Sequence, residues 1–391
     1  MVKLLHIFNR YIDFGGEEMV YEKVLRETED LFYNSSYLRS SSEWTGNGAP
    51  SKTSQLRAFF FNPETIKDLE AHAGTDCVVA HNIYPVISPS LYSYCKDQEV
   101  PVVQFIHNFR PFSVGGGCWA KGEVCDAGLD GRLWPEVWRG AWQGSRLKSA
   151  LMAFTLRRAQ KKLDVVKRWI AISDFMRTSF IRAGVPAERV VTLRHSWDAM
   201  PSLPDTRDNG YYLLLARLIP EKGIETALDA WEKMGGDAPR LVIAGTGPLE
   251  KRVQELAEKS DGKIEFAGFV DGNRKRKLIS NCRAMLAPSI WWEPLGLVTY
   301  EAYDYGKLMI AAASGGLTET IIDGVTGYLH TAGDAESLVR AVGNVESLSA
   351  EERTQMGREG RNWLLENADP EKWKSDFKRI IDEVILEHSA S

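Results

Sequence analysis

Short apolar runs alternate with amphipathic stretches along the whole chain. Such runs are typical of buried parallel strands, and the stretches between them have the helical period of segments that cover a sheet on both faces. Each half of the chain therefore predicts its own doubly wound α/β unit. The predicted strands are Val2–Phe8, Cys77–Ala80, Val100–Ile106, Trp169–Ile172, Val190–Leu193, Tyr211–Ala216, Leu241–Ala244, Ile264–Phe266, Met285–Ala287 and Leu308–Ala311.

The length of 391 residues also indicates two domains, because one hydrophobic core stops growing well before this size. The natural linker is residues 199–209, which contain two prolines and several turn formers but no apolar period. Near the end of the chain, Pro370–Ile385 predicts a helix with Trp373, Phe377 and Ile381 on its apolar face.

Two regions interrupt the alternation of strands and helices. Ser40–Ser54 is polar and contains glycine, which predicts a mobile surface loop. Asn108–Ser145 has no clear period but contains a Gly115–Gly117 run and four tryptophans. A long irregular insertion of this composition is usually a lid or a binding loop.

Charge, hydropathy and cysteine content narrow the class of protein. A formal net charge of −5 argues against the broad basic field of nonspecific nucleic-acid binders. No apolar stretch is long enough for a membrane span or a signal-peptide core, so we expect a cytoplasmic protein with at most peripheral membrane association. The five scattered cysteines fit reduced thiols. Cys118 and Cys125 lack the neighbours that a zinc site needs, so we expect no metal and leave their role open.

Candidate chemistry is expected after the strands, because open parallel sheets bind ligands beyond their carboxyl ends. Gly15 and Gly16 follow the first strand and precede a helix, where backbone NH groups could approach an anion or simply form a tight turn. The spacing is not that of the dinucleotide fingerprint. In the second half, Arg217 and Lys222 follow a strand, and as cations around a turn they could converge on a diphosphate or remain solvated.

The most informative segment is APSIWWEPLGLVTYEAYDYG. Pro294 and Gly296 place Glu293 in a loop and begin a helix near Gly296, so that Glu301 lies inside the helix. The free NH groups of Gly296–Val298 suit a phosphate, and the two carboxylates suit vicinal hydroxyls. Together these groups predict a nucleotide-sugar site, whereas an isolated carboxylate pair would be read as surface charge. Gly245 and Gly247 end another strand and allow close backbone approach.

Several motifs in order resemble the retaining glycosyltransferases of family 4, which have the GT-B fold. These motifs are GGEE, HN after a strand, ARLIPEKG, AGTGP, EPLGLVTYE and ASGGLTETIIDGVTGYL. The resemblance implies two Rossmann-like doubly wound parallel-sheet domains that face each other across a cleft. Residues 1–198 with 370–391 would bind the acceptor, and residues 210–369 would bind the nucleoside diphosphate sugar.

The resemblance also implies roles for residues. Arg217 and Lys222 would hold the diphosphate, Glu301 the ribose, and Glu293 the transferred sugar. Gly15 and Gly16 would approach the phosphates from the first domain, and His107 in QFIHN would lie beside the donor sugar. Backbone contacts near Gly268–Val270 would recognise the base. The remaining expected donor-binding positions are Gly245, Gly247, Phe269, Val270, Pro294, Leu295, Gly296, Leu297 and Val298.

The expected reaction is transfer from a UDP or GDP sugar to a glycan, glycolipid or lipid-linked acceptor, with no cofactor and no metal. Same-face attack would let the leaving diphosphate help to deprotonate the acceptor, so stabilising its charge would be the main catalytic task of Arg217 and Lys222. The segment His195–Asp198 departs from the family habit of an asparagine-glycine turn there, which leaves the hinge geometry open. Alternatives are a noncatalytic nucleotide-sugar-binding scaffold, or an epimerase or phosphorylase of the same architecture.

Residues 131–172 hold ten Lys or Arg against Glu136 and Asp164, a local net charge of +8 within an acidic chain. Ser145 can cap a helix with Leu147, Leu151 and Phe154 at helical spacing. One interpretation is a core-packed helix with a solvated basic face. The other is a basic amphipathic surface that meets anionic lipid headgroups or a lipid diphosphate acceptor.

Overall fold

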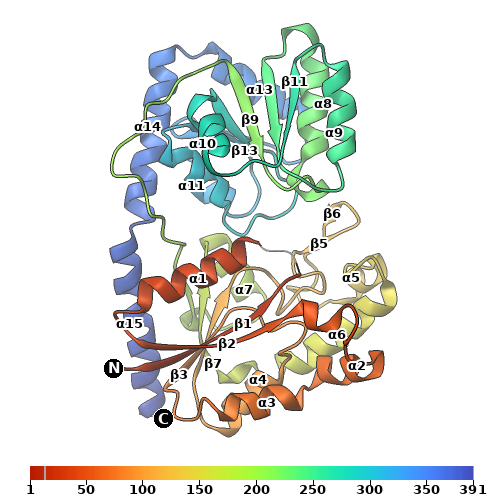
Figure 1. Cartoon of the computed structure of the whole chain (residues 1–391), viewed down its shortest axis with the longest axis vertical. Helices are drawn as coiled ribbons and strands as arrows, with labels where there is room; N and C mark the ends of the chain where they lie inside the picture. Colours follow the sequence, from red (N-terminus) through yellow and green to blue (C-terminus); the bar gives the residue numbers. More distant parts are fainter. Residues whose placement is uncertain (13–14, 391) are drawn as a thin grey trace. The chain divides into compact units, whose positions relative to one another are not determined.

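The computed structural model describes residues 1–12 and 15–390, which form two compact units. Unit 1 comprises residues 1–121, 125–195 and 370–391, and unit 2 comprises residues 122–124 and 196–369. In Figure 1 the red helices and strands and the last blue helix, α15, belong to unit 1, and the teal segments belong to unit 2.

Unit 1 is built on a six-stranded, wholly parallel sheet in the order β2-β1-β3-β4-β7-β8. Its central strands are buried on both faces, which explains their continuous apolar sequences. In Figure 1, α1 lies on one face of this sheet, while α3 and α4 lie on the other. The strands are β1 (Lys3–Arg10), β2 (Tyr33–Ser40), β3 (Cys77–Ala80), β4 (Val102–Ile106), β7 (Val166–Ala171) and β8 (Val190–Thr192).

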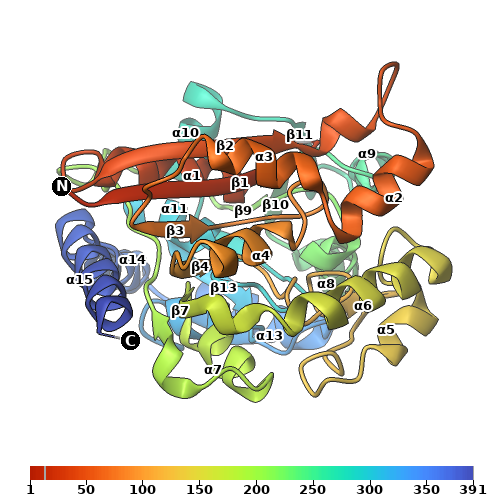
Figure 2. The same ribbon diagram turned by 90° about the horizontal axis from the view of Figure 1, so that it is seen from below.

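Helices connect the strands of unit 1, with two in succession before β3 and before β7, and the last helix follows unit 2 in the sequence. They are α1 (Gly16–Thr28), α2 (Lys52–Phe60), α3 (Pro63–Glu70), α4 (Ser90–Asp97), α5 (Trp134–Arg139), α6 (Arg146–Gln160), α7 (Asp174–Arg182) and α15 (Pro370–Ser389). Helix α15 buries the apolar face that the sequence predicted, and Phe377 packs edge-on against Phe32 at a ring-centroid distance of 6.1 Å. Figure 2 shows the same ribbon from below, with the strands of the unit 1 sheet and the helices that cover it.

Unit 2 repeats this architecture with the sheet order β11-β10-β9-β12-β13-β14, again wholly parallel. Its strands are β9 (Tyr211–Leu215), β10 (Arg240–Ala244), β11 (Ile264–Gly268), β12 (Ala284–Ala287), β13 (Leu308–Ala312) and β14 (Gly327–His330). Its helices are α8 (Ile224–Met234), α9 (Glu250–Lys259), α10 (Gly272–Asn281), α11 (Leu297–Asp304), α12 (Leu317–Thr320), α13 (Ala335–Ser347) and α14 (Ala350–Asn367).

All ten strands expected from the apolar runs are present, but the structure adds one edge strand to each sheet. Strand β2 reads YNSSYLRS and is mostly half-exposed, so it carries no apolar run. Strand β14 is only four residues long and begins at Gly327. Edge strands have a single paired neighbour and need less apolar sequence, which is why hydropathy alone missed them.

Two expectations about loops need correction. The segment Ser40–Ser54 is not one loop, because it contains the end of β2, a 3-10 turn at Ser41–Trp44 and the start of α2. A capping box formed by Ser40 and Glu43 fixes that turn. The insertion at Asn108–Ser145 is largely irregular, as expected, but it also contains the short strands β5 (Trp119–Ala120) and β6 (Glu123–Val124) and helix α5.

The segment 199–209, which the sequence marks as a linker, is hydrogen-bonded to the rest of unit 2. The NH groups of Arg207 and Asn209 donate to the carbonyl groups of Ser280 and Asn281, each at 2.9 Å. The Met200 NH donates to the Asp304 carboxylate at 2.9 Å, and Asp304 is also paired with the buried Arg361. Among the described residues, no helix combines the length and the apolar character needed to cross a membrane.

Two helical glycines of unit 2 give a matched test of its packing. At Gly357 in α14, an added Cβ would overlap the carbonyl oxygen of Gly306, whereas at Gly343 in α13 it would meet nothing within 4 Å. We expect Gly343→Ala to stabilise the protein by about 0.5–1 kcal/mol, because alanine favours the helix. Gly357→Ala should instead cost about 1–3 kcal/mol through overpacking. Calorimetric melting temperatures that move in the same direction for both variants would contradict this packing.

Candidate functional site

The strand order of unit 2 reverses direction between β9 and β12, which lie side by side although they are far apart in sequence. At such a switch point the loops after the two strands diverge to opposite sides of the sheet and leave room for a ligand at its carboxyl edge. The loop after β9 carries Arg217 and Lys222, and the loop after β12 carries Glu293. The topology therefore brings these predicted residues to one edge of the sheet.

Backbone packing holds the two loops together. Gly223 has φ +69°, and a Cβ there would overlap the carbonyl oxygen of Pro288 just after β12. The Ile290 NH also donates to the Glu221 carbonyl at 2.9 Å. Only glycine allows both this left-handed conformation and this close approach. Lys222, immediately before Gly223, is thus fixed beside the loop that carries Glu293.

Lys222 and Glu293 form an ion pair, with 2.5 Å between Nζ and Oε1. The same oxygen accepts a hydrogen bond from the Ser289 hydroxyl at 2.6 Å. Burial by itself raises the pKa of the Glu293 carboxyl, but the charge and hydrogen bond of Lys222 together with the Ser289 bond outweigh it, so that the pKa is lowered overall. Glu293 is therefore an ionised carboxylate, although only 8% of the residue is exposed.

The turn that contains Gly316 packs against the loop from Glu293 to Gly296 and fixes its position. The Gly316 NH donates to the Glu293 carbonyl at 2.7 Å, and a Cβ on Gly316 would lie 2.6 Å from the carbonyl oxygen of Pro294. Leu295 is buried. Gly296 has φ +90° and is the N-cap residue of α11. This packing sets where α11 begins, and so it sets where the NH groups of Leu297 and Val298 lie.

Glu301 lies on the second turn of α11, as expected, but it is not isolated. Its Oε2 atom lies 2.9 Å from Nζ of Lys275 on α10. Side-chain exposures of 22% for Glu301 and 34% for Lys275 leave both groups accessible from solvent. The exposed Arg217 is the least constrained of the predicted residues, since no ion pair involves it in the described part of the chain.

The remaining predicted positions of unit 2 lie in loops around this edge. A Cβ on Gly245 would overlap the Ala216 carbonyl oxygen, and one on Gly247 would lie 2.5 Å from the Leu218 carbonyl oxygen. The packing of the loops after β9 and β10 therefore already requires both glycines, independently of any ligand. After β11, Phe269 is 66% exposed and Val270 is buried.

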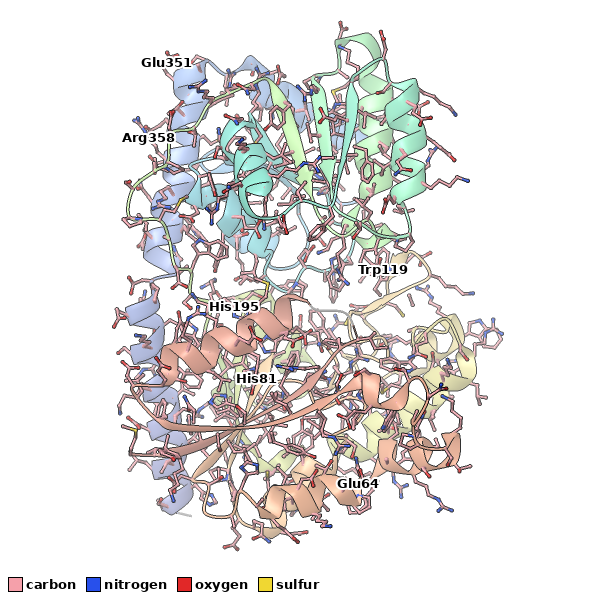
Figure 3. The ribbon with its side chains drawn as sticks, viewed as in Figure 1. Glu64, His81, Trp119, His195, Glu351 and Arg358 are labelled. Atoms are coloured by element: carbon pink, nitrogen blue, oxygen red, sulfur yellow. The ribbon has the colours of Figure 1, made fainter. Side chains whose placement is uncertain are left out.

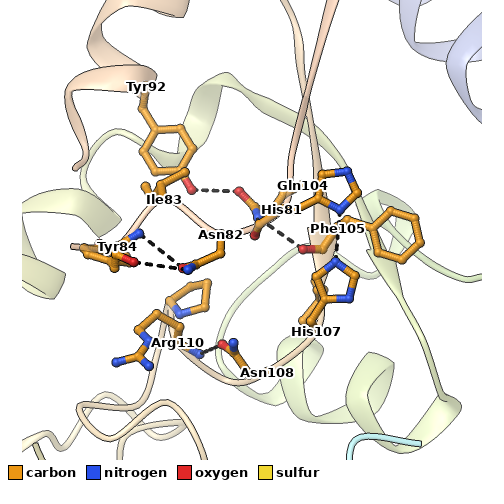
Figure 4. A pocket seen from close by; sticks show the side chains of 12 residues that line it. His81, Asn82, Ile83, Tyr84, Tyr92, Gln104, Phe105, His107, Asn108 and Arg110 are labelled. Atoms are coloured by element: carbon orange, nitrogen blue, oxygen red, sulfur yellow. Dashed lines mark hydrogen bonds between the residues drawn. The ribbon is translucent and has the colours of Figure 1, made fainter. Parts of the chain in front are cut away.

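The structure places His107 in unit 1, directly after β4. His107 Nε2 lies 3.0 Å from Nδ1 of His81, which follows the neighbouring strand β3, and the two rings stack with centroids 5.3 Å apart. Figure 4 shows this pair beside a cavity of about 20 Å³, which has room for roughly one water molecule but not for a sugar. The histidine pair therefore lines a cavity that is too small to accommodate a substrate.

His107 belongs to a row of buried histidines in unit 1. His6 Nδ1 lies 3.5 Å from His81 Nε2, and His195 stacks on His107 with centroids 5.8 Å apart. Burial lowers the pKa of His6 to about 4 and that of His195 to about 3, and it lowers the pKa values of His81 and His107 well below the ordinary range. All four imidazoles are therefore neutral at pH 7, and each offers one donor and one acceptor nitrogen. Figure 3 labels His81 and His195.

The loop after β1 contributes a further polar cluster to unit 1. Gly15 is the N-cap residue of α1, its φ of −148° is accessible to any residue, and a Cβ on Gly15 or Gly16 would meet nothing within 4 Å. The fold therefore does not require glycine at either position. Next to them, the Glu17 carboxylate accepts hydrogen bonds from the Tyr11 hydroxyl at 3.0 Å and from Asn108 Nδ2 at 2.8 Å.

Sequence reasoning missed several residues that the structure adds to these clusters. Ser289 directly follows the apolar run of β12, and a polar residue at the carboxyl end of a predicted strand is a signal that could have identified it. His81 directly follows β3 and could have been identified in the same way. No sequence pattern pairs Lys275 with Glu301 or Glu17 with Asn108, because those contacts depend on tertiary packing. The five buried cysteines are free thiols, and no group of three or more His, Cys, Asp or Glu residues in 1–12 and 15–390 is arranged to hold a metal ion.

The segment that carries the Lys222–Glu293 pair and α11 also matches a known protein family. Residues 197–363 match the family model described as Glycosyl transferases group 1. The match lies within unit 2. The glycogen synthase of Pseudomonas aeruginosa is 35% identical over 133 residues, which are 34% of this chain and 26% of that protein. That of Xanthomonas campestris pv. campestris is 32% identical over 134 residues, 34% of this chain and 28% of that protein. The chain thus matches about a quarter of the length of these relatives.

Solved structures resemble the whole chain. HepE from Anabaena, determined in complex with UDP-glucose, has a TM-score of 0.71 at 18% identity and covers 98% of this chain and 100% of that chain. Sucrose-phosphate synthase from Thermosynechococcus elongatus has a TM-score of 0.72 at 16% identity and covers 99% of this chain and 100% of that chain. At such identities the likeness concerns the fold, and it confirms the predicted GT-B class with two Rossmann-like parallel-sheet domains.

The burial of His107 and His81 predicts a specific pH response. Because their pKa values lie well below the ordinary value of about 6.5, both rings should stay neutral as the pH falls from 8 to about 5.5. NMR of ¹⁵N-labelled histidine, assigned with His107→Gln and His81→Gln, should show ring signals that do not shift over this range. The same sample in urea provides the control, since every histidine should then titrate near 6.5. Titration of His107 near pH 6.5 in the folded protein would show that this burial is wrong.

Proposed function

We propose that the protein is a retaining glycosyltransferase of family 4 that transfers a sugar from a nucleoside diphosphate sugar to a glycan, glycolipid or lipid-linked acceptor. The observation that carries this proposal is the Lys222–Glu293 pair at the β9/β12 switch point, next to the N-terminus of α11. A cation, an ionised carboxylate and free backbone NH groups at one edge suit the diphosphate and the sugar of such a donor.

Each group has a proposed role that fits its environment. The exposed Arg217 would bind the diphosphate with its planar guanidinium, and Lys222 would contribute a point charge. An ammonium group has three donors, so the bond to Glu293 leaves Lys222 able to contact a phosphate. The NH groups of Gly296–Val298 would contact phosphate and sugar, and Glu301 would accept the ribose hydroxyls. Lys275, the ion-pair partner of Glu301, would orient that carboxylate.

The proposed reaction needs no protein nucleophile and no metal. The bond between C1 of the sugar and the diphosphate oxygen breaks with its electron pair on oxygen, and the acceptor hydroxyl forms its bond to C1 on the same face. The proton of that hydroxyl passes to the departing phosphate. Arg217 and Lys222 would stabilise the charge that develops on the diphosphate. His107 of unit 1, neutral and buried, would donate a hydrogen bond to a sugar or acceptor hydroxyl.

The base of the donor is the part of the substrate for which the fewest side-chain contacts can be proposed. Backbone contacts around Phe269 and Val270 would recognise it, and a uracil base is favoured because the similar HepE was determined with UDP-glucose. A thermal-shift panel of UDP, GDP, TDP and ADP sugars tests this choice, since a bound donor raises the melting temperature by mass action. A rise with UDP sugars alone is the expected result.

Arg217 allows a test of binding that does not disturb the fold. Because it is exposed and forms no ion pair in the described residues, Arg217→Ala should leave the melting temperature unchanged. Loss of a charge-assisted contact to diphosphate should weaken UDP binding about tenfold or more by titration calorimetry. The control is Arg340→Ala, which removes a 67% exposed arginine from α13. Equal UDP affinity in wild type and Arg217→Ala would refute the assignment.

Lys222 must be tested both alone and together with Glu293, because removing the lysine leaves the Glu293 carboxylate without its cation. Lys222→Met should lower the free energy of unfolding by about 2–3 kcal/mol. This is less than the loss expected on breaking a fully buried ion pair, because the lysine side chain is 20% exposed. Lys222→Met with Glu293→Gln removes both charges and should recover most of that free energy of unfolding.

If Lys222 contacts the diphosphate, the double variant should still bind UDP weakly and have little transferase activity despite its restored stability. Urea unfolding and titration calorimetry measure the two effects separately. Wild-type UDP affinity in the double variant would restrict Lys222 to a structural role.

A further inference from the structure

One surface of unit 1 combines exposed apolar side chains with cations. Helices α2, α5 and α6 lie along the same side of unit 1 in both ribbon views (Figures 1 and 2). Ring contacts join them, since Phe60 at the end of α2 packs edge-on against Phe154 of α6 at 5.6 Å. We call this the basic-aromatic surface and define it by the exposed residues Trp134, Trp138, Arg146, Leu147, Phe154 and Arg158.

Leu147 and Phe154 of helix α6 point outward. The sequence alone allowed this apolar side of the helix to lie either in the core or at the surface. Ser145 caps the helix, as predicted. Leu147 is 83% exposed and Phe154 is 52% exposed. These two residues and Arg158 recur at helical spacing and so share one face. The opposite face supplies the buried residues Ser149, Met152, Thr155, Leu156 and Ala159.

Helix α5 extends the same surface with two tryptophans. Trp134 and Trp138 are 66% and 56% exposed, and their ring centroids lie 6.0 Å apart. Arg146 ties this pair to the start of α6. Its Nε donates to the Trp138 carbonyl at 2.9 Å, and its guanidinium lies 4.1 Å from the centre of the Trp138 ring. Exposing this much aromatic and aliphatic area to water is unfavourable, which indicates an interaction site.

The charge around these side chains is positive and is not neutralised locally. Arg146, Lys148, Arg158 and Lys161 are exposed and form no ion pair among residues 1–12 and 15–390. The Glu136 carboxylate points inward, where it accepts hydrogen bonds from the Ser113 hydroxyl at 2.9 Å and the Gly115 NH at 3.1 Å. Asp164 is paired with Lys96. The two acidic residues in the basic segment therefore do not offset the cations of this surface.

We propose that the basic-aromatic surface docks on a membrane that contains anionic lipids. Tryptophan, leucine and phenylalanine side chains suit the boundary between headgroups and acyl chains, and arginine and lysine suit lipid phosphates. Pairs in which a cation covers a ring, such as Arg146 on Trp138 and Arg158 on Phe154, place both kinds of group at the same depth. The proposal concerns unit 1 and goes beyond the sugar transfer, so vesicle binding and UDP binding can fail independently.

Vesicle cosedimentation of the full chain tests the proposal. Phosphatidylcholine vesicles with and without phosphatidylglycerol are compared at low and high salt. We expect sedimentation with the anionic vesicles alone, and less of it at high salt, because screening weakens the attraction. Absence of binding to both kinds of vesicle, or equal binding to both, would overturn the proposal. So would binding to RNA or to a second copy of the chain without any vesicle binding.

Surface variants identify the residues responsible, and circular dichroism checks that each variant keeps the fold. Arg146→Gln with Arg158→Gln should lower the partition coefficient about fivefold per removed cation. Leu147→Ser with Phe154→Ser should reduce binding by at least about tenfold through lost apolar burial. The matched control is Leu386→Ser, since Leu386 is 69% exposed on α15, outside this surface. Circular dichroism and UDP affinity should be unchanged in all variants, which would show that the loss of vesicle binding does not come from unfolding or from damage to the donor site. Vesicle binding by the variants equal to that of the wild type would overturn the proposal.

Discussion

The ion pair between Lys222 and Glu293 joins the two loops on which the candidate site of unit 2 is built. A buried carboxylate is costly without a cation, and the loop after β9 supplies one to the loop after β12. Backbone constraints make this pairing possible: Gly223 lies against Pro288, and Gly315 and Gly316 pack against the segment from Glu293 to Leu295. The start of α11, and with it the position of Glu301, follows from the same loop.

Unit 1 organises its strand ends in the opposite way. Where unit 2 gathers charged groups, unit 1 excludes charge from a row of stacked histidines beside Phe105. Burial keeps these rings neutral, so they can only exchange hydrogen bonds. Both units thus have a six-stranded parallel sheet, with different strand orders, but the loops of one sheet hold an ion pair and those of the other a row of neutral histidines.

The sequence predicted ten strands, including all eight that have a neighbour on both sides, because a parallel sheet covered on both faces requires continuous apolar runs. It could not predict β2, whose polar sequence reflects its place at the edge of the sheet. Lys222 and Glu293 were both recognised as site residues, yet their contact was not, because 71 positions separate them and only the strand order brings them together. Spacing alone could not decide which face of α6 is buried, since Ser149 and Thr155 take inward positions beside Met152 and Leu156.

Helix α15 belongs to unit 1 although all of unit 2 precedes it in the sequence. Its buried face contributes Trp373, Phe377 and Ile381 to unit 1. During synthesis, unit 2 therefore leaves the ribosome in full while unit 1 still lacks this covering helix. Domains that are continuous in sequence can fold as they emerge, but unit 1 is completed only by residues 370–391, which follow the whole of residues 196–369. Until then its uncovered apolar surface is a hazard for aggregation, and the order of translation favours maturation of unit 2 first.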